Sequence, residues 1–195
     1  MTPLARAIPL GLTLLRIALG PGIVFVAWVA PRPALLAGCL AVAFLSDVFD
    51  GIIARRLGMA TPALRRLDSV ADTVFYVGAT CAVWRLQPAA IITHLRGLLA
   101  LVALELARYT LDLVKFRREA SYHTWSAKGW GIALFLAFLA VLAFGRTGWP
   151  VSVAVALGIV ADLEGLAISL VLPGWRHDVP SVVHAVRVRS ASRTT

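Results

Sequence analysis

Four aspartates in the first half of the chain have the residue type and spacing of a metal-binding site. Asp47 lies three residues before Asp50, which places both on one face of a helix, and Asp68 lies four residues before Asp72 with the same consequence. Carboxylates this close repel one another and need a nearby cation to remain ionised. Oxygen ligands alone favour Mg²⁺ or Mn²⁺ over zinc, which typically takes histidine or cysteine. The pattern therefore predicts a divalent-cation site, with two ions able to clamp a diphosphate.

The segment between the two pairs carries groups that suit a phosphate. Gly51 has no side chain, so a ligand can approach the backbone closely. Arg55 offers two parallel donors to a phosphate, and it would also anchor the end of a membrane helix. The alternative for the four aspartates is a structural role as helix caps or interfacial anchors. That role is sufficient for one aspartate, whereas four at this spacing favour metal binding.

The composition indicates that lipid surrounds the elements carrying these residues. The chain has 195 residues, of which 59% are hydrophobic and 15% charged, and its mean hydropathy is +0.83. Soluble domains carry about 25% charged residues. The apolar residues form runs near the roughly 20 residues that cross a ~30 Å hydrocarbon core. We therefore predict an all-α, polytopic membrane protein with a six-transmembrane-helix bundle over residues 1–175 and a basic cytoplasmic tail over residues 176–195.

The six expected helices place the aspartates at one edge of the membrane. They cover about residues 10–30, 33–55, 67–84, 88–116 (or 95–116), 125–144 and 149–172. The second and third are joined by a loop of only about a dozen residues, so they should be antiparallel neighbours. One aspartate pair ends the second helix and the other begins the third. The four carboxylates are therefore expected to converge.

The net charge of +9 is distributed as membrane orientation requires, which excludes nucleic acid as the main partner. Basic residues concentrate at the N-terminus, in alternate loops and in the tail: Arg6, Arg55, Arg56, Arg65, Arg66, Lys115, Arg117, Arg118, Lys128, Arg176, Arg187, Arg189 and Arg193. The opposite side has only Arg32, Arg85, Arg96 and Arg146. Both termini and the aspartates are therefore expected on the cytoplasmic side, in contact with anionic membrane lipids.

The run from Asp47 to Asp72 resembles the signature D-x2-D-G-x2-A-R-x8-G-x3-D-x3-D of CDP-alcohol phosphatidyltransferases. The matching fixed positions are Asp47, Asp50, Gly51, Ala54, Arg55, Asp68 and Asp72. Leu64 stands where the signature has its second glycine. Upstream, the sequence LTLLRIAL over residues 12–19 is similar to the start of phosphatidylglycerophosphate synthases. The six-helix layout of the family agrees with the expected spans.

The resemblance implies an enzyme that transfers a phosphatidyl group from CDP-diacylglycerol, or a related CDP-linked donor, to a small polar alcohol and releases CMP. Glycerol 3-phosphate is the first candidate acceptor. The metal ligands that it implies for two Mg²⁺ or Mn²⁺ ions are Asp47, Asp50, Asp68 and Asp72. The last of these would also be the general base on the acceptor hydroxyl. Gly51, Arg55 and Thr61 match positions that contact the CDP-linked substrate, and a homodimer is left open because relatives are often dimeric.

Leu64 makes this chain a divergent member, because the glycine it replaces is expected to give the nucleotide room. Its effect on donor choice or activity stays open, as do the acceptor, the metal preference and the oligomeric state. Two alternatives also stay open: a divalent-cation transport protein that uses the same aspartates, and an inactive member of the same fold. Against transport, the chain has no internal repeat and its acids lie at the membrane edge.

Other polar residues give weaker signals. His123, Ser126 and Lys128 could help to bind an acceptor or a phosphate, or could belong to an interfacial belt. Glu105 and Arg108 are expected to pair within one helix, with acceptor recognition as the alternative. Asp162 and Glu164 interrupt the last span, where they predict polar contacts inside the bundle.

Overall fold

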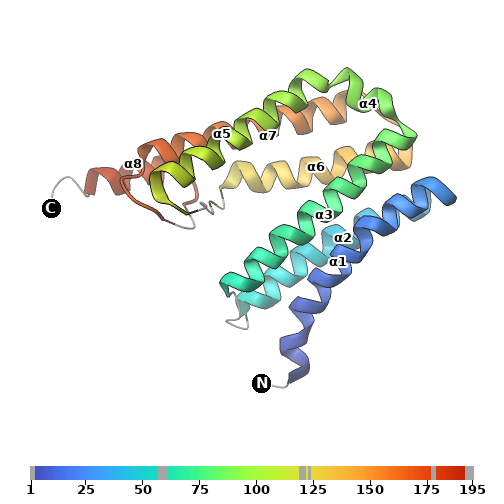
Figure 1. The fold of residues 1–195 in the computed structure, drawn as a ribbon, viewed down its shortest axis with the longest axis horizontal. Helices are drawn as coiled ribbons and strands as arrows, with labels where there is room; N and C mark the ends of the chain where they lie inside the picture. The colour runs from blue at the N-terminus through green and yellow to red at the C-terminus, as the bar shows by residue number, and fades with distance from the viewer. Residues whose placement is uncertain (1–2, 57–60, 119–121, 123, 177–178, 192–195) are drawn as a thin grey trace. The chain divides into compact units, whose positions relative to one another are not determined.

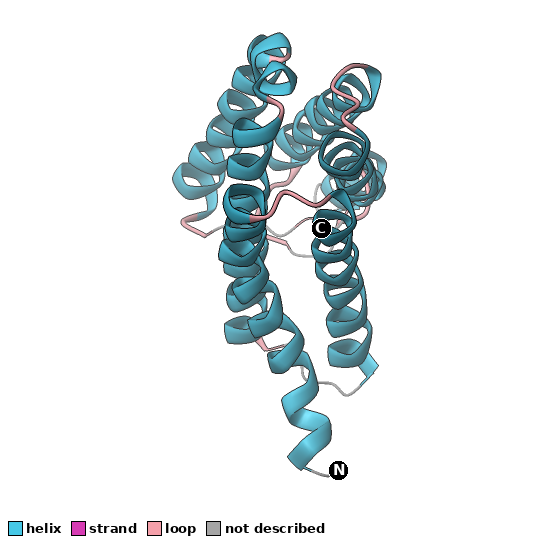
Figure 2. Cartoon of the chain, turned by 90° about the vertical axis from the view of Figure 1, so that its right-hand side faces the viewer, coloured by secondary structure: helices cyan, strands magenta, loops and turns pink. Residues whose placement is uncertain are grey.

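The described part of the chain is built from helices alone. The computed structural model describes residues 3–56, 61–118, 122, 124–176 and 179–191, and among these it contains helices and loops but no strand (Figure 2). The helices are α1 (Pro3–Val29), α2 (Pro33–Arg56), α3 (Pro62–Leu86), α4 (Pro88–Thr93), α5 (Leu95–Phe116), α6 (Trp125–Phe144), α7 (Trp149–Val171) and α8 (Val182–Ala191). The prediction of an all-α fold is confirmed.

Four of these helices are long and apolar enough to cross a membrane. They comprise the segments Ile8–Val29, Pro33–Ala54, Trp125–Phe144 and Trp149–Val171. The helices α3 and α5 have 25 and 22 residues, but charged residues occur along both. This charge lowers their hydropathy below that of a typical span. The chain is therefore an integral membrane protein by composition, and the count of six spans stays a prediction.

The chain divides into two compact units. The first comprises Met1–Ile91 with Phe138–Thr147, and the second comprises Ile92–Ala137 with Gly148–Thr195. The first unit therefore holds α1, α2 and α3, and the second holds α5, α7 and α8.

In the first unit, α1 packs against both α2 and α3 (Figure 1). The described residues of α2 and α3 make little direct contact with each other, so the expectation that these helices are neighbours is wrong. Each of the three helices buries one stripe of residues at spacings of three and four, as helices packed along one face do. The buried stripe of α1 is Pro9, Thr13, Arg16, Gly20, Ile23 and Ala27, and that of α2 is Leu36, Leu40, Ala43, Ser46, Asp50 and Ala54. Both stripes are apolar at one end and polar at the other. The three helices therefore enclose polar groups next to an apolar core.

Two glycines bring α1 and α3 into close contact. A Cβ atom on Gly78 would lie 2.4 Å from the backbone oxygen of Gly20, and one on Gly20 would lie 2.8 Å from the backbone oxygen of Val74. Backbone atoms cannot rotate out of the way as side chains can. Small residues at such contacts are typical of packed membrane helices. The closeness of α1 to α3 therefore depends on the absence of side chains at these two positions.

In the second unit, α5 packs along α7. Gly97 of α5 faces Val155, while Gly158 and Gly165 of α7 face the side chains of Trp130 and Arg108. The helix α8, which lies inside the expected tail, packs against the end of α7 through a small core of Ile168, Leu172, Val179 and Ala185. The expected tail therefore contains a packed helix that periodicity alone did not predict.

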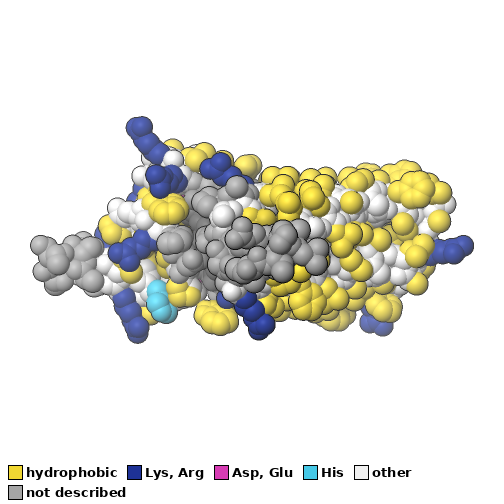
Figure 3. Space-filling model, turned by 90° about the horizontal axis from the view of Figure 1, so that it is seen from below, with side chains coloured by type: hydrophobic (Ala, Val, Ile, Leu, Met, Phe, Trp, Pro, Cys, Tyr) yellow, Lys and Arg dark blue, Asp and Glu magenta, His cyan; other side chains and the backbone are white. Residues whose placement is uncertain are grey.

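Large hydrophobic side chains cover much of the outer surface, as the yellow area in Figure 3 shows. Phe25, Val114 and Phe144 are each more than three-fifths exposed. Soluble proteins rarely expose such extensive apolar surface. The surface therefore agrees with helices whose outer faces contact lipid.

The contact between α1 and α3 generates the first prediction. We expect Gly78→Ala to lower the stability of the protein by about 1–3 kcal/mol, because the new methyl group overpacks against the backbone of Gly20. The measurement is thermal unfolding in detergent. Gly22→Ala is the matched control on α1, because no atom lies within 4 Å of a Cβ there. Equal unfolding temperatures for the two variants would contradict the close packing.

Candidate functional site

The four aspartates converge on the guanidinium group of Arg16. Arg16 is 1% exposed, and its four carboxylate partners come from α2 and α3. Its Nη1 atom donates to Asp47 Oδ1 at 2.9 Å and also to Asp72. Its Nη2 atom donates to Asp68 Oδ1 at 3.0 Å and also to Asp50. Each terminal nitrogen therefore joins one carboxylate of α2 to one of α3.

The local sequence explains why these groups meet. Thr13 and Arg16 are three residues apart on the buried stripe of α1, so both face α2. The hydroxyl of Thr13 lies 2.9 Å from the backbone oxygen of Pro9 and 3.4 Å from Asp50 Oδ2. Since α2 runs toward the short connection and α3 runs away from it, their aspartate pairs lie at the same level. The expected convergence of the four aspartates is observed.

The four carboxylates differ in burial. The side chain of Asp50 is 6% exposed, whereas those of Asp47, Asp68 and Asp72 are 45%, 39% and 38% exposed. A buried carboxylate is tolerated only when it is paired and hydrogen-bonded, and Asp50 has Arg16 and Thr13 as partners. The site is therefore closed on one side and accessible from the other.

The donor set fits a hard divalent cation. Asp47, Asp50 and Asp68 each offer one oxygen, and these oxygens lie within 4.8 Å of one another. Around Mg²⁺ at its usual distance of about 2.1 Å, opposite oxygens are about 4.2 Å apart and adjacent ones about 3 Å apart. Small side-chain shifts would therefore bring the three oxygens to coordination distance. The Arg16 guanidinium is a cation that already pairs with these three carboxylates.

Asp72 is distinct from the other three aspartates. It is not part of the three-carboxylate group, although it shares Nη1 of Arg16 with Asp47. Its position on α3 is one turn beyond Asp68. The expected set of four is therefore assembled as three clustered carboxylates and one adjacent carboxylate.

The residues expected to contact substrate lie close to the aspartates in sequence. Gly51 is half-buried in α2, directly after Asp50. Arg55 lies in α2, but its side chain is outside the described part of the structure. Thr61 caps the N-terminus of α3, where its hydroxyl oxygen accepts a hydrogen bond from the Leu64 amide at 3.2 Å. The side chain of Leu64 is half-buried in the first turn of α3.

Arg16 is the site residue that sequence reasoning missed. In the sequence, Arg16 belongs to the segment over residues 12–19 that is similar to the start of phosphatidylglycerophosphate synthases, and no function was predicted for it. A signal was present, because a single arginine inside an otherwise apolar span requires an acidic partner. The four aspartates were the available partners. What the sequence could not supply was the register between α1 and α3, which depends on the glycine contact.

A second polar network lies inside the other unit. Arg108 donates to Glu105 at 2.6 Å, so the expected pair within α5 is confirmed. Asp162, on the buried face of α7, lies beside this pair and interacts with Glu105. Arg108 also lies over Gly165, where an added Cβ would meet its Cδ atom at 2.8 Å. These contacts join α5 to α7 through charged groups.

The first turn of α6 makes a separate polar contact with α7. Ser126 donates to Glu164, whose other oxygen accepts the Val182 amide of α8 at 3.4 Å. The ammonium group of Lys128 lies 4.6 Å from the centre of the Trp125 ring. The expected polar contact of Glu164 is therefore present, whereas His123 lies outside the described residues.

A buried carboxylate lies further along the α5–α7 contact. Asp112 accepts a hydrogen bond from the Ser169 hydroxyl at 2.5 Å, and Tyr122 lies 3.2 Å from that hydroxyl. Burial raises the pKa of the Tyr122 phenol, so it remains neutral. Lys115 donates to the backbone oxygens of Ser169 and Leu170, at the end of α7. These bonds stabilise the end of the unit to which α8 attaches.

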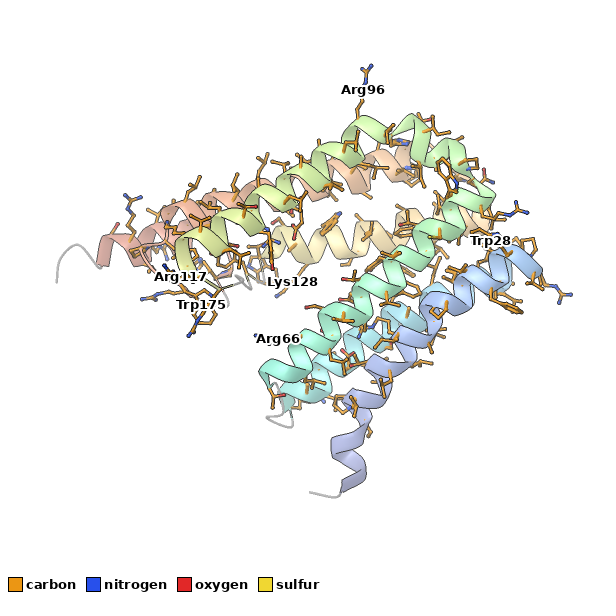
Figure 4. The ribbon with its side chains drawn as sticks, in the orientation of Figure 1. Trp28, Arg66, Arg96, Arg117, Lys128 and Trp175 are labelled. Atoms are coloured by element: carbon orange, nitrogen blue, oxygen red, sulfur yellow. The ribbon has the colours of Figure 1, made fainter. Side chains whose placement is uncertain are left out.

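The basic residues of the second unit gather at that same end. Arg117, Lys128 and Trp175 are found there in Figure 4, while Arg96 lies at the other end of α5. Arg118 also belongs to this end, with its guanidinium 5.5 Å from the centre of the Trp175 ring. Cationic and tryptophan side chains are enriched together at membrane–water interfaces. This end of the unit therefore has the character of an interface.

One of the comparisons with known proteins identifies the family of the chain. The sequence model of the CDP-alcohol phosphatidyltransferase family matches residues 6–171, which include α1 to α7 apart from the first residues of α1. No curated protein and no solved structure matches the chain. The match covers Arg16 and all four aspartates.

Proposed function

Because this chain belongs to the CDP-alcohol phosphatidyltransferase family, we propose that it transfers a phosphatidyl group from CDP-diacylglycerol to a small polar alcohol. Glycerol 3-phosphate is the first candidate for the acceptor, and CMP is the leaving product. The observation that carries the proposal is the convergence of four carboxylates, from the matching segment of α2 and α3, at one accessible site.

In this proposal Asp47, Asp50, Asp68 and Asp72 hold two Mg²⁺ or Mn²⁺ ions. When bound, the ions neutralise the diphosphate of the donor and the charge that develops on the leaving phosphate. The carboxylates supply the negative charge that retains them, and their oxygens suit a hard cation. Thr13 and the surrounding helices hold Asp50 in one orientation. The protein therefore contributes a rigid set of oxygen ligands.

Asp72 is the proposed general base. Its side chain is more exposed than that of Asp50, and it lies outside the cluster of three oxygens. The carboxylate accepts the proton of the acceptor hydroxyl while that oxygen forms a bond to the lipid-side phosphorus. The bond from this phosphorus to the bridging oxygen breaks, and CMP leaves with the electron pair. A carboxylate next to a metal site can thus bind and deprotonate in turn.

The donor would lie along the segment between the aspartate pairs. Gly51 leaves the backbone open to a phosphate, and Arg55 would pair with one. The Thr61 hydroxyl uses its oxygen to cap α3 and keeps its proton for donation to the substrate. Leu64, in the first turn of α3, is proposed to narrow the nucleotide position that a glycine would leave wider. The specific CDP-linked donor would depend on this side chain.

A transfer assay tests the function directly. With purified protein, labelled CDP-diacylglycerol, Mg²⁺ and glycerol 3-phosphate, we expect CMP release that stops when excess chelator is added. A panel of other small alcohols identifies the acceptor. If no CDP-linked donor yields CMP with Mg²⁺ or Mn²⁺, the chain is an inactive member of the family. Undiminished turnover in excess chelator would overturn the metal assignment.

Replacement of the proposed base separates chemistry from binding. We expect Asp72→Asn to reduce turnover by ~10²–10⁴-fold, because the amide cannot accept the hydroxyl proton. Binding of the CDP-linked donor, measured by titration, should fall far less. Asp50→Asn is the comparison, since it should weaken metal binding as well as turnover. An Asp72→Asn enzyme within tenfold of the wild-type rate would show that another group is the base.

We also propose that the carboxylates, the basic ends of the helices and both termini face the cytoplasm. The support is the excess of basic residues at the N-terminus, in alternate loops and in the tail, whereas the opposite side of the sequence pattern has Arg32, Arg85, Arg96 and Arg146. A reporter fused to the C-terminus should be active only in the cytoplasm. Activity of that reporter on the opposite side of the membrane would reverse the orientation.

A further inference from the structure

The guanidinium of Arg16 lies among the carboxylates that are proposed to bind the metal ions. Its two terminal nitrogens lie within 3.0 Å of Asp47 Oδ1 and Asp68 Oδ1, and they also bind Asp50 and Asp72. A metal ion bound to such oxygens would lie about 2.1 Å from them. The ion and the guanidinium would then be close together, and their positive charges would repel. The two cations therefore compete for the same carboxylates.

The guanidinium holds the carboxylates without neutralising them. Arg16 brings one positive charge to four carboxyl groups, so it cannot balance all four when they are ionised. Two divalent ions would bring four positive charges to the same oxygens. The site with Arg16 alone therefore still attracts further cations.

The hydrogen bonds that hold the Arg16 side chain are all made by its terminal atoms Nη1 and Nη2. The Nε atom is buried and has no hydrogen-bond partner among the described residues. The stem of an arginine side chain has several rotatable bonds, so the end can shift from one carboxylate partner to another while α1 stays in place. The group keeps its charge because arginine is not deprotonated in proteins. When metal ions displace the guanidinium of Arg16, its positive charge therefore moves but is not lost.

We infer that Arg16 is a built-in cation that holds the four carboxylates together in the absence of metal and competes with divalent ions for them. The inference rests on the proposed metal-dependent function and adds to it a residue that sets the metal affinity. Metal binding then requires the guanidinium to withdraw from the oxygens that the ions take. The interaction between α1 and the other two helices changes in the same step.

The experiment measures Mn²⁺ binding by electron paramagnetic resonance on the full chain in detergent, without substrate. We expect Arg16→Gln to bind Mn²⁺ roughly tenfold or more tightly than wild type, because an internal competitor has been removed. Without metal this variant should unfold at a lower temperature than wild type. Saturating Mn²⁺ should narrow that difference, since the wild-type arginine is then displaced as well.

Two further variants complete the test. Arg96→Gln removes the same charge from the start of α5, in the second unit, and should leave Mn²⁺ affinity unchanged (Figure 4). Arg16→Lys retains a charge but lacks the fork that bridges two pairs of carboxylates, so its affinity should fall between those of wild type and Arg16→Gln. If Arg16→Gln does not fold, the lysine variant carries the test. Affinity no greater than wild type in the Arg16 variant that folds overturns the inference, as does an equal gain in Arg96→Gln.

The same preparations distinguish this inference from the proposed function. CMP release by wild type, together with unchanged Mn²⁺ affinity in the Arg16 variants, would reject only the competition. Tighter Mn²⁺ binding without CMP release from any CDP-linked donor would reject the transfer reaction and keep the competition. Absence of Mn²⁺ binding in wild type and Arg16→Gln alike would reject both the metal site and the competition.

Discussion

The charge of Arg16 is enclosed by protein, and its partners determine the arrangement of the first unit. A buried arginine cannot lose its proton and must be paired, so α1 is stable only where carboxylates reach it. Those carboxylates come from the end of α2 and the start of α3. A single side chain therefore fixes the rotation of three helices about their own axes. It also brings together four aspartates that would repel one another without it.

Close packing of α1 against α3 is the second condition for this arrangement. The carbonyl of Gly20 occupies the space that a side chain on Gly78 would fill. Both glycines lie more than one helical turn along their helices from Arg16 and Asp72. Without this approach the guanidinium would not reach carboxylates on both neighbouring helices. Lipid supplies little driving force for helix association, so small residues and polar contacts must provide it. The glycine contact and the ion pairs of Arg16 therefore stabilise the same packing of α1 against α3, at neighbouring turns of the helices.

Much of this geometry was predictable from periodicity and charge. The spans at Pro33, Trp125 and Trp149 begin where apolar runs begin, because hydropathy alone defines them. The convergence of Asp47 with Asp72 followed from a short connection between antiparallel helices. The partner at their centre did not follow, since it lies on a third helix whose register depends on contacts far apart in sequence. The helix α8 was missed for a related reason: its ten residues have little amphipathic pattern, and packing against Ile168 and Leu172 stabilises it.

The two units use buried charge differently, which indicates where chemistry can occur. In the second unit Arg108 has Glu105 as a partner within the same helix, and Asp112 is satisfied by Ser169. These two groups therefore each have a partner within the second unit. In the first unit one guanidinium faces four carboxylates, and three of them remain partly exposed. An unbalanced and accessible negative charge is costly to maintain for packing alone. The proposed metal site accounts for this charge beside the half-buried Gly51 of α2.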